Sequence, residues 1–299
     1  QCGAAGGEGA DDLPPALELS ADTPNCRGVI VLTEKGGRGI SLPAVAVDRQ
    51  LIIESSQSVE LLPVVESTAL LSALAKLLTP PRLAGVKVMV TAGPTLEDID
   101  PVRFIGNRSS GKMGYAVATA AWQAGAQVQL ISGPVNLPAP FGVTVQRVRS
   151  AEEMQQAVEA GIAEQDIYIS TAAVADFRPH VPSDRKIKKS GAGLAINLTV
   201  NPDILRSVAG RSTPPFCVGF AAETDQVENY ARGKLRDKNL QMVAANLVGG
   251  EQGGFESDQN SLHLFWHGGE RLLPFTGKEQ LAVSLIEAVA ERYRQWRRS

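Results

Sequence analysis

The sequence predicts an α/β fold: a Rossmann-like, doubly wound, mostly parallel sheet with a late β-hairpin, preceded by an irregular N-terminal segment. Two observations predict this fold. Between residues 86 and 245, short apolar runs alternate with stretches of helix length, which is the element order of doubly wound sheets. Polar or small-residue segments follow three of the apolar runs. Ligands bind beyond the carboxyl ends of the strands in such sheets, so one shared site is expected there.

The first half of this region supplies three strands and one helix. Residues 86–91, 127–132 and 143–148 are apolar runs of strand length. Residues 114–123 combine small and apolar residues at helical spacing. Gly125 is expected to end that helix, because glycine tolerates the left-handed backbone found at helix C-termini.

The next helix carries its own start signal. Ser150 precedes residues 151–163 and is a favourable N-cap. Glu152 and Glu153 fall in the first turn, where the helix dipole favours negative charge. The apolar run 167–171 follows as a strand.

The remaining elements complete the alternation and then depart from it. Strands are expected at 217–220 and 242–245, with a helix at 227–238 between them. A hairpin at 262–266 and 272–274 and a closing helix at 279–296 follow. Leu281, Leu285 and Val289 are spaced to share one face of the closing helix.

The chain divides at a proline-containing linker. Residues 1–78 are predicted to be an N-terminal segment, 79–85 a linker with two prolines and a final glycine, and 86–299 the main domain. The first 27 residues are rich in Gly, Ala, Asp and Pro and lack periodicity, which is typical of disorder. Within the rest of this segment we expect two strands and a helix: 28–33, 51–53 and 67–78.

Composition indicates a soluble enzyme acting on small molecules. No apolar run approaches the ~20 residues of a membrane helix. The net charge of −3 offers no basic excess for a nucleic-acid partner. Three cysteines without a C-x-x-C pair argue against a disulfide scaffold or a zinc site. The start of the chain has no signal-peptide pattern, so a cytoplasmic location is expected.

A glycine-rich loop at residues 106–114 suggests an anionic ligand. Amide, guanidinium, hydroxyl and ammonium donors are concentrated between Asn107 and Lys112, directly before a predicted helix whose N-terminal amides favour anions. The loop nearly matches a P-loop, but Met113 replaces the hydroxyl residue that would hold Mg²⁺. The P-loop interpretation is therefore disfavoured.

Several segments together resemble one enzyme family. They occur in order and without gaps: TAGPT (91–95), DPVRFIGNRSSGKMG (100–114), TAAVADFRP (171–179), KIKK (186–189), NPDIL (201–205), VGFAAET (218–224), KLRDKNLQMVAAN (234–246) and GFESDQNSLHLFW (254–266). From about residue 85 onward the chain resembles the phosphopantothenate–cysteine ligase half of the bacterial bifunctional coenzyme A biosynthesis protein.

The resemblance implies a reaction and its partners. The family joins 4′-phosphopantothenate to L-cysteine, using CTP and Mg²⁺, through an acyl-cytidylate that releases pyrophosphate and then CMP. It also implies a homodimer formed through the ligase domain, with a basic arm that reaches a partner's site. Motifs of the flavin-dependent decarboxylase half are absent, so FMN is not expected and residues 1–78 are a remnant or an unrelated segment.

The resemblance assigns catalytic roles to three residues. Lys186 neutralises the triphosphate while the acyl-nucleotide forms, and Asn107 acts chiefly on the acyl-nucleotide and its conversion to product. Arg103 suits a substrate carboxylate or phosphate, because its guanidinium presents a fork of donors. Without the resemblance, these would be an exposed basic loop, a turn asparagine and a surface ion pair.

The resemblance also implies a nucleotide site, formed by Thr171, Ala172, Ala173, Asp176, Lys186, Pro202, Asp203, Ile204, Leu205, Phe220, Lys234 and Lys238. No metal ligand is assigned. On local grounds Asp176 is equally well a capping residue and Phe220 a core residue. Two other functions stay open: a nicotinamide-dependent reductase, which the missing G-x-G-x-x-G disfavours, and a non-catalytic nucleotide-binding module.

Overall fold

The structure is a computed structural model that describes residues 72, 75, 76, 78–189, 191, 193–223, 226–247 and 258–298. Its contacts divide the chain into two units, Gln1–Pro80 and Pro81–Ser299. The strands expected at 28–33 and 51–53 lie outside the described residues. Of the helix expected at 67–78, residues 72, 75, 76 and 78 are described, and they are helical. The functional boundary at 79–85 stays a prediction.

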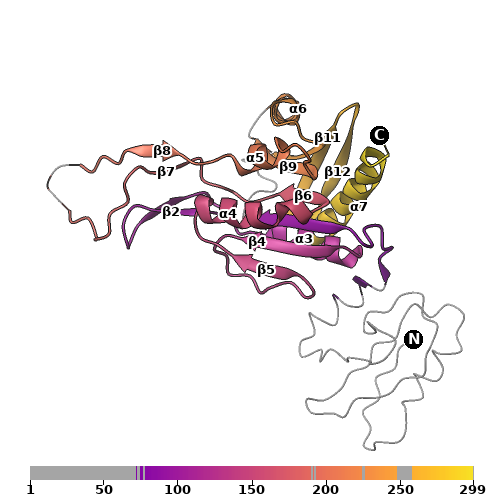
Figure 1. The fold of residues 1–299 in the computed structure, drawn as a ribbon, viewed down its shortest axis with the longest axis horizontal. Helices are drawn as coiled ribbons and strands as arrows, with labels where there is room; N and C mark the ends of the chain where they lie inside the picture. Colours follow the sequence, from indigo (N-terminus) through magenta and orange to yellow (C-terminus); the bar gives the residue numbers. More distant parts are fainter. Residues whose placement is uncertain are drawn as a thin grey trace, which may run out of the picture. The chain divides into compact units, whose positions relative to one another are not determined.

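An eight-stranded sheet organises the described part of the second unit (Figure 1). Its order is β12-β11-β10-β9-β6-β1-β4-β5. The strands are β1 (Lys87–Ala92), β4 (Gln127–Ser132), β5 (Thr144–Arg147), β6 (Ile167–Ser170), β9 (Phe216–Glu223), β10 (Met242–Leu247), β11 (Gln259–Trp266) and β12 (Gly269–Gly277). From β5 to β10, neighbouring strands of the sheet are parallel. When these six strands are renumbered from 1 to 6 along the chain, their order across the sheet is 3-2-1-4-5-6, as in Rossmann folds. β11 and β12 add the antiparallel hairpin.

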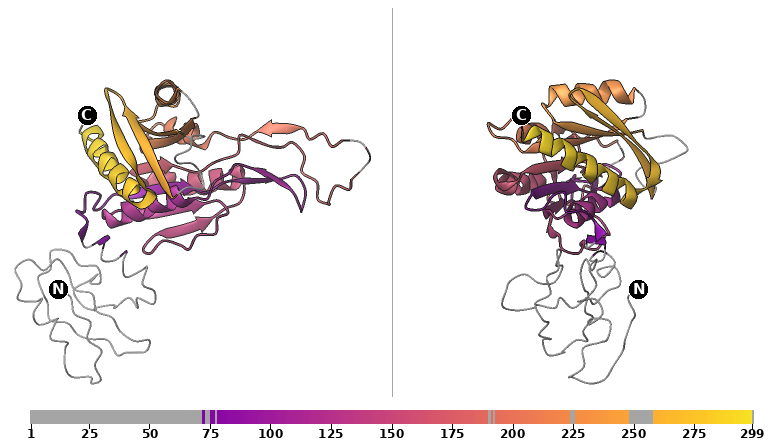
Figure 2. Two further views of the ribbon diagram at one scale, coloured as in Figure 1. Left: turned by 180° about the vertical axis from the view of Figure 1, so that it is seen from behind. Right: turned by 90° about the vertical axis from the view of Figure 1, so that its right-hand side faces the viewer.

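Helices cover both faces of the sheet (Figures 1 and 2). α4 (Ala151–Gly161), α5 (Ile204–Ala209) and α6 (Val227–Asp237) share one core with alternate strand residues such as Met89, Tyr168 and Val243. α3 (Lys112–Gln123) and α7 (Lys278–Trp296) pack against each other and against the sheet. The doubly wound α/β prediction is confirmed, and the late hairpin is present.

Local signals explain where two of the helices begin and end. The Ser150 side chain accepts a hydrogen bond from the Glu153 N–H at 3.1 Å, and the Glu153 carboxylate accepts one from the Arg149 N–H at 2.7 Å. The first bond is a serine N-cap, and the second ties the first turn of α4 to the residue before that cap. A short 3₁₀ helix (Ile162–Glu164) extends α4. Gly125 follows the C-cap of α3 with a φ of 96°, as the glycine there predicts.

Two short ladders, at which no strands were predicted from the sequence, form an arm. β2 (Leu96–Asp98) pairs with β3 (Phe104–Gly106), and β7 (Phe177–Pro179) pairs with β8 (Leu198–Val200), both antiparallel. We call these four strands, together with residues 99–103 between β2 and β3 and the described residues between β7 and β8, the arm. Figures 1 and 2 show it projecting away from the main sheet, with the β2–β3 ladder beside the β7–β8 ladder. Among the described helices, none is long and apolar enough to cross a membrane.

Candidate nucleotide and acyl-transfer site

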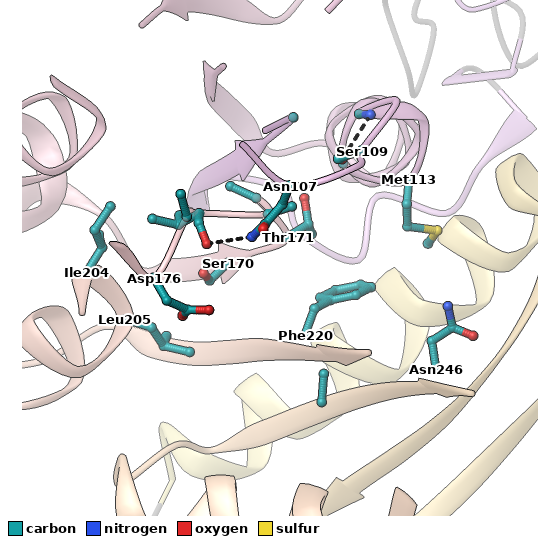
Figure 3. A pocket seen from close by; sticks show the side chains of 18 of the residues that line it. Asn107, Ser109, Met113, Ser170, Thr171, Asp176, Ile204, Leu205, Phe220 and Asn246 are labelled. Carbon is teal, nitrogen blue, oxygen red and sulfur yellow. Dashed lines mark hydrogen bonds between the residues drawn. The ribbon is translucent and has the colours of Figure 1, made fainter. Parts of the chain in front are cut away.

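A cavity of about 930 Å³ lies at the carboxyl ends of β1, β6, β9 and β10 (Figure 3). β1 and β6 are adjacent in the sheet, but the chain continues from β1 to β4 on one side and from β6 to β9 on the other. Such a switch point leaves a crevice between the loops, which is where Rossmann-like sheets bind ligands. The position of the cavity therefore follows from strand order alone.

The loops after β1 and β6 form the floor of the cavity. The Ala173 N–H donates to the Gly93 carbonyl at 2.9 Å, and the Thr95 N–H donates to the Ala173 carbonyl at 3.3 Å. The buried Thr95 hydroxyl then accepts the Ala175 N–H at 3.0 Å. These bonds join the TAGPT and TAAVAD segments into one rigid edge, with small side chains towards the ligand space.

Glycines allow the N-terminus of α3 to approach this floor. Gly93 and Gly111 have φ values of 75° and 73°, and a Cβ on either would lie within 3 Å of the Val135 side chain. A Cβ on Gly114 would overlap the Ala92 Cβ and the Thr171 hydroxyl. Helix α3 therefore begins at the cavity, where its N-terminal amides favour an anion.

Asn107 directly follows β3, and its side chain points to the loop after β6. Its Nδ2 donates to the Val174 carbonyl at 2.9 Å, a bond drawn in Figure 3. This bond fixes the direction of the amide. The same nitrogen carries a second N–H, which can donate to a ligand oxygen.

Asn201 holds the opposite side of that loop. The buried Asn201 donates through Nδ2 to the Ala175 carbonyl at 2.8 Å, and its Oδ1 accepts from Arg178 at 2.9 Å. The Asn201 N–H donates to the Asp176 carbonyl at 2.8 Å. Asp176 is thereby fixed at the cavity wall. Asp203 caps α5 by accepting from the Arg206 N–H at 3.0 Å.

Lysines give the cavity its charge. The Lys234 ammonium donates to the Phe220 carbonyl, and the Lys238 ammonium contacts Asp203 at 2.8 Å. Burial by itself would raise the pKa of Asp203, but the Lys238 contact and the capping bond lower it. Asp203 therefore stays ionised beside Lys238.

The hairpin side of the cavity adds further polar groups. Lys278 is buried at the start of α7, and its pKa is lowered by burial and by Lys112. Lys112 contacts Asp258 at 2.6 Å. In the view of Figure 3, Phe220 lies between Asp176 on one side and Asn246 on the other.

The summed charge favours anions. Among the described residues that line the cavity, five side chains are cationic, Arg108, Lys112, Lys234, Lys238 and Lys278, and two are carboxylates, Asp176 and Asp203. Some polar atoms are buried without a hydrogen-bonding partner, including the Tyr168 hydroxyl and Asn246 Oδ1, and both residues line the cavity. Burial raises the pKa of Tyr168 to about 12, so this phenol is neutral at the cavity wall.

Most of the residues assigned from the sequence lie around this cavity. Its lining includes Asn107, Thr171, Ala172, Ala173, Asp176, Pro202, Asp203, Ile204, Leu205, Phe220, Lys234 and Lys238. Arg103 and Lys186 are not among the lining residues. They lie on the arm, where Lys186 is exposed and Arg103 pairs with Asp100.

The cavity is also lined by four residues for which no role was predicted from the sequence: Tyr168, Asn246, Asn260 and Lys278. Asn246 offered a signal, because it follows an apolar run as the other site residues do. Lys278 offered none, since it opens a helix after an antiparallel hairpin. Among the described residues, no group of three His, Cys, Asp or Glu side chains is placed to hold a metal ion.

Comparisons with known proteins agree with this geometry. Residues 83–293 match the family model described as the DNA/pantothenate metabolism flavoprotein C-terminal domain. The Coenzyme A biosynthesis bifunctional protein CoaBC of Vibrio parahaemolyticus is 51% identical over 215 residues, which are 71% of this chain and 54% of that protein. The chain thus spans about half the length of the curated relatives it matches.

Solved structures match over the same region. The C-terminal domain of a Coenzyme A biosynthesis bifunctional protein CoaBC has 38% identity and a TM-score of 0.62, covering 72% of this chain and 99% of that one. A Cab2 variant in complex with phosphopantothenate-cysteine has a TM-score of 0.58 over 78% of this chain and 94% of that one. At 16% identity, the latter supports the fold alone.

Proposed function

This chain belongs to the family of the DNA/pantothenate metabolism flavoprotein C-terminal domain, and we propose that it is a phosphopantothenate–cysteine ligase. Its substrates are 4′-phosphopantothenate, L-cysteine and CTP. The single observation that carries the proposal is the cationic cavity at the strand ends, with the fixed amide of Asn107 at its wall.

The reaction has two steps. A carboxylate is a poor electrophile, so the pantothenate carboxylate first attacks the α-phosphorus of CTP, forming an acyl-cytidylate and releasing pyrophosphate. The cysteine amine then attacks the acyl carbon, the bond to CMP breaks, and the amine loses a proton as the amide forms. Both steps build negative charge, which fixed donors and cations stabilise.

The cavity suits these reactants in size and charge. Its volume is at the upper end of the ~300–1,000 Å³ of ligand pockets, so it can hold a nucleotide beside a second substrate. We assign the triphosphate to the side with Lys234 and Lys238, and the sugar or base to Asp176. Mg²⁺ would enter with the triphosphate, held by phosphate oxygens together with water molecules.

The arm supports the proposal of a homodimer. Large apolar side chains are exposed along it, with exposed fractions between 46% and 77%: Val102, Phe104, Phe177, Val181, Leu194, Leu198 and Val200. Exposed apolar surface of this extent is typical of an interface. A second copy covering it would also bring Lys186 and Arg103 of one protomer towards the cavity of the other. Light scattering on the purified protein tests this, and a monomer at micromolar concentration would contradict it.

The experiment that tests the function measures pyrophosphate. The protein is incubated with 4′-phosphopantothenate and each of CTP, ATP, GTP or UTP, with and without cysteine. We expect CTP to give the fastest release and cysteine to be needed for CMP. Nucleotide binding without pyrophosphate release would instead indicate a non-catalytic module. A nicotinamide absorbance that changes on adding substrate would indicate a reductase.

A further inference from the structure

The turn between β2 and β3 contains a buried carboxylate among exposed residues. Asp100 is 2% exposed, whereas residues 101–104 are exposed. Burying a carboxylate is costly unless it is paired and hydrogen-bonded. The burial of Asp100 therefore depends on the groups that pair with its two oxygens.

The two oxygens of Asp100 have different partners. Oδ1 accepts from the Val102 and Arg103 N–H groups at 2.8 and 2.9 Å, as in an ordinary Asx turn. Oδ2 accepts from the Arg103 guanidinium and from the Ile187 N–H at 3.1 Å. The first set shapes the turn. The second joins it to a segment 87 residues further along the chain.

Ile187 is held from both sides. Its N–H donates to Asp100, and its carbonyl accepts from Arg103 Nη2 at 2.8 Å. A further bond runs from the Ser183 N–H to the Ile99 carbonyl at 2.9 Å. The stretch from Ser183 to Ile187 is therefore tied to the β2–β3 turn at both ends.

This stretch contains Lys186, whose carbonyl carbon is bonded to the Ile187 nitrogen. Fixing the Ile187 N–H thus fixes the main-chain direction at Lys186. The Arg103 guanidinium holds the pKa of Asp100 well below its usual range. The carboxylate is therefore ionised, and its contacts persist, at any pH at which an enzyme of this kind works.

We propose that Asp100 is a positioning residue, which uses Arg103 and the Ile187 main chain to hold the basic segment Lys186–Lys189 in the orientation needed for catalysis. The role assigned to the segment rests on the proposed function, whereas the holding itself does not. Asp100 contacts no reacting atom in this scheme and acts through Lys186.

The test compares two carboxylates of the same hairpin. Asp100→Asn keeps the side-chain size but puts an amide beside Arg103. Asp98→Asn is the matched control, because Asp98 pairs with Arg149, at 2.6 and 3.1 Å, and not with the described residues 183–187. Limited trypsin digestion, followed by mass spectrometry, reports cleavage after Arg185, Lys186, Lys188 and Lys189. We expect cleavage there to accelerate about tenfold in Asp100→Asn, because the local opening is no longer opposed, and to stay at the parent rate in Asp98→Asn.

Activity supplies the second readout. In Asp100→Asn, pyrophosphate release should fall and the KM for CTP should rise, while cysteine should discharge the preformed acyl-cytidylate at the parent rate. The double variant with Lys186→Gln should be no slower than Lys186→Gln alone, because two residues that act through one contact are not additive. If Asp100→Asn does not fold, as judged by circular dichroism, Arg103→Lys is used instead, and faster cleavage is again expected.

Parental cleavage together with parental pyrophosphate release in Asp100→Asn would overturn the proposal. The proposal would also be overturned if the rate of the double variant fell by the product of the reductions in Asp100→Asn and Lys186→Gln. If the parent protein releases no pyrophosphate with any nucleotide, the proposed function fails, and the trypsin comparison still decides whether Asp100 holds the segment.

Discussion

The cavity floor and the arm both carry residues assigned to one reaction, but they are built in different ways. The floor is made of a buried loop after β1 and a half-buried loop after β6, joined by main-chain hydrogen bonds such as Ala173 to Gly93. The arm consists of strands of three residues, exposes large apolar side chains, and carries Arg103 and Lys186 outside the cavity lining.

This difference suggests a division of labour. A rigid scaffold holds binding groups precisely, because its side chains and main chain are fixed by packing. A projecting segment can bring charge to a ligand that is already bound and help to exclude water. Under the proposed function, changes to the packing of the floor alter stability, whereas changes to exposed side chains of the arm alter the reaction with the fold unchanged.

The largest expected effect is on the arm. Lys186→Gln should slow acyl-cytidylate formation by about 10³-fold or more, since cations on a transferring phosphoryl group contribute on this scale. The circular dichroism spectrum should be unchanged, because Lys186 is exposed. Pyrophosphate release measures the step. Lys189→Gln removes the same charge from the same segment and should reduce the rate of pyrophosphate release far less. An equal reduction would indicate that the segment acts through its total positive charge and not through Lys186.

A change at Asn107, whose side chain bonds to the floor, should divide the two half-reactions. Asn107→Asp puts a carboxylate where an acyl oxygen gains negative charge, and losing one such donor costs about 10²–10³ in rate. The variant should still release pyrophosphate from CTP and phosphopantothenate, and should accumulate the acyl-cytidylate, detected by mass spectrometry. Cysteine should then discharge it slowly. A variant that binds CTP and never forms the intermediate would place Asn107 in the first step.

The packing of the floor predicts a stability change of defined sign. Gly114→Ala should destabilise the domain by about 1–3 kcal/mol, because its Cβ would overlap Ala92 and Thr171 and the core must be overpacked. Each kcal/mol lowers the Tm of a domain of this size by about 2–4 °C. Gly233→Ala is the control: nothing lies within 4 Å of its Cβ inside α6, so alanine should stabilise by about 0.5–1 kcal/mol. Thermal unfolding of both variants measures the difference. Equal melting temperatures would show that the floor moves to accommodate the added methyl group without loss of stability.

The smallest effect is expected from the N-terminal unit. Removal of residues 1–78 should leave pyrophosphate release unchanged, because the motifs that resemble the ligase family all lie after residue 85. The assay compares the full and shortened chains at equal concentration. Loss of folding or of nucleotide binding on truncation would place part of this segment in the ligase domain.

The sequence by itself determined the elements whose structure is local. Strands of four to nine residues and their helices show periodicity, and caps such as Ser150 lie beside the helices they start. The parallel order of the sheet follows from that alternation, and the order of strands places the cavity. The motifs then identified the family, and most residues assigned from them line that cavity.

The tertiary structure decided what depends on distant pairing. β2, β3, β7 and β8 have three residues each, too few to show a period, and each is defined only by its partner. Lys278 and Asn260 reach the cavity because an antiparallel hairpin turns the chain back. The bond from Ile187 to Asp100 joins residues 87 apart. No local pattern encodes such a contact, because its free energy comes from burying and pairing groups that only the finished fold brings together.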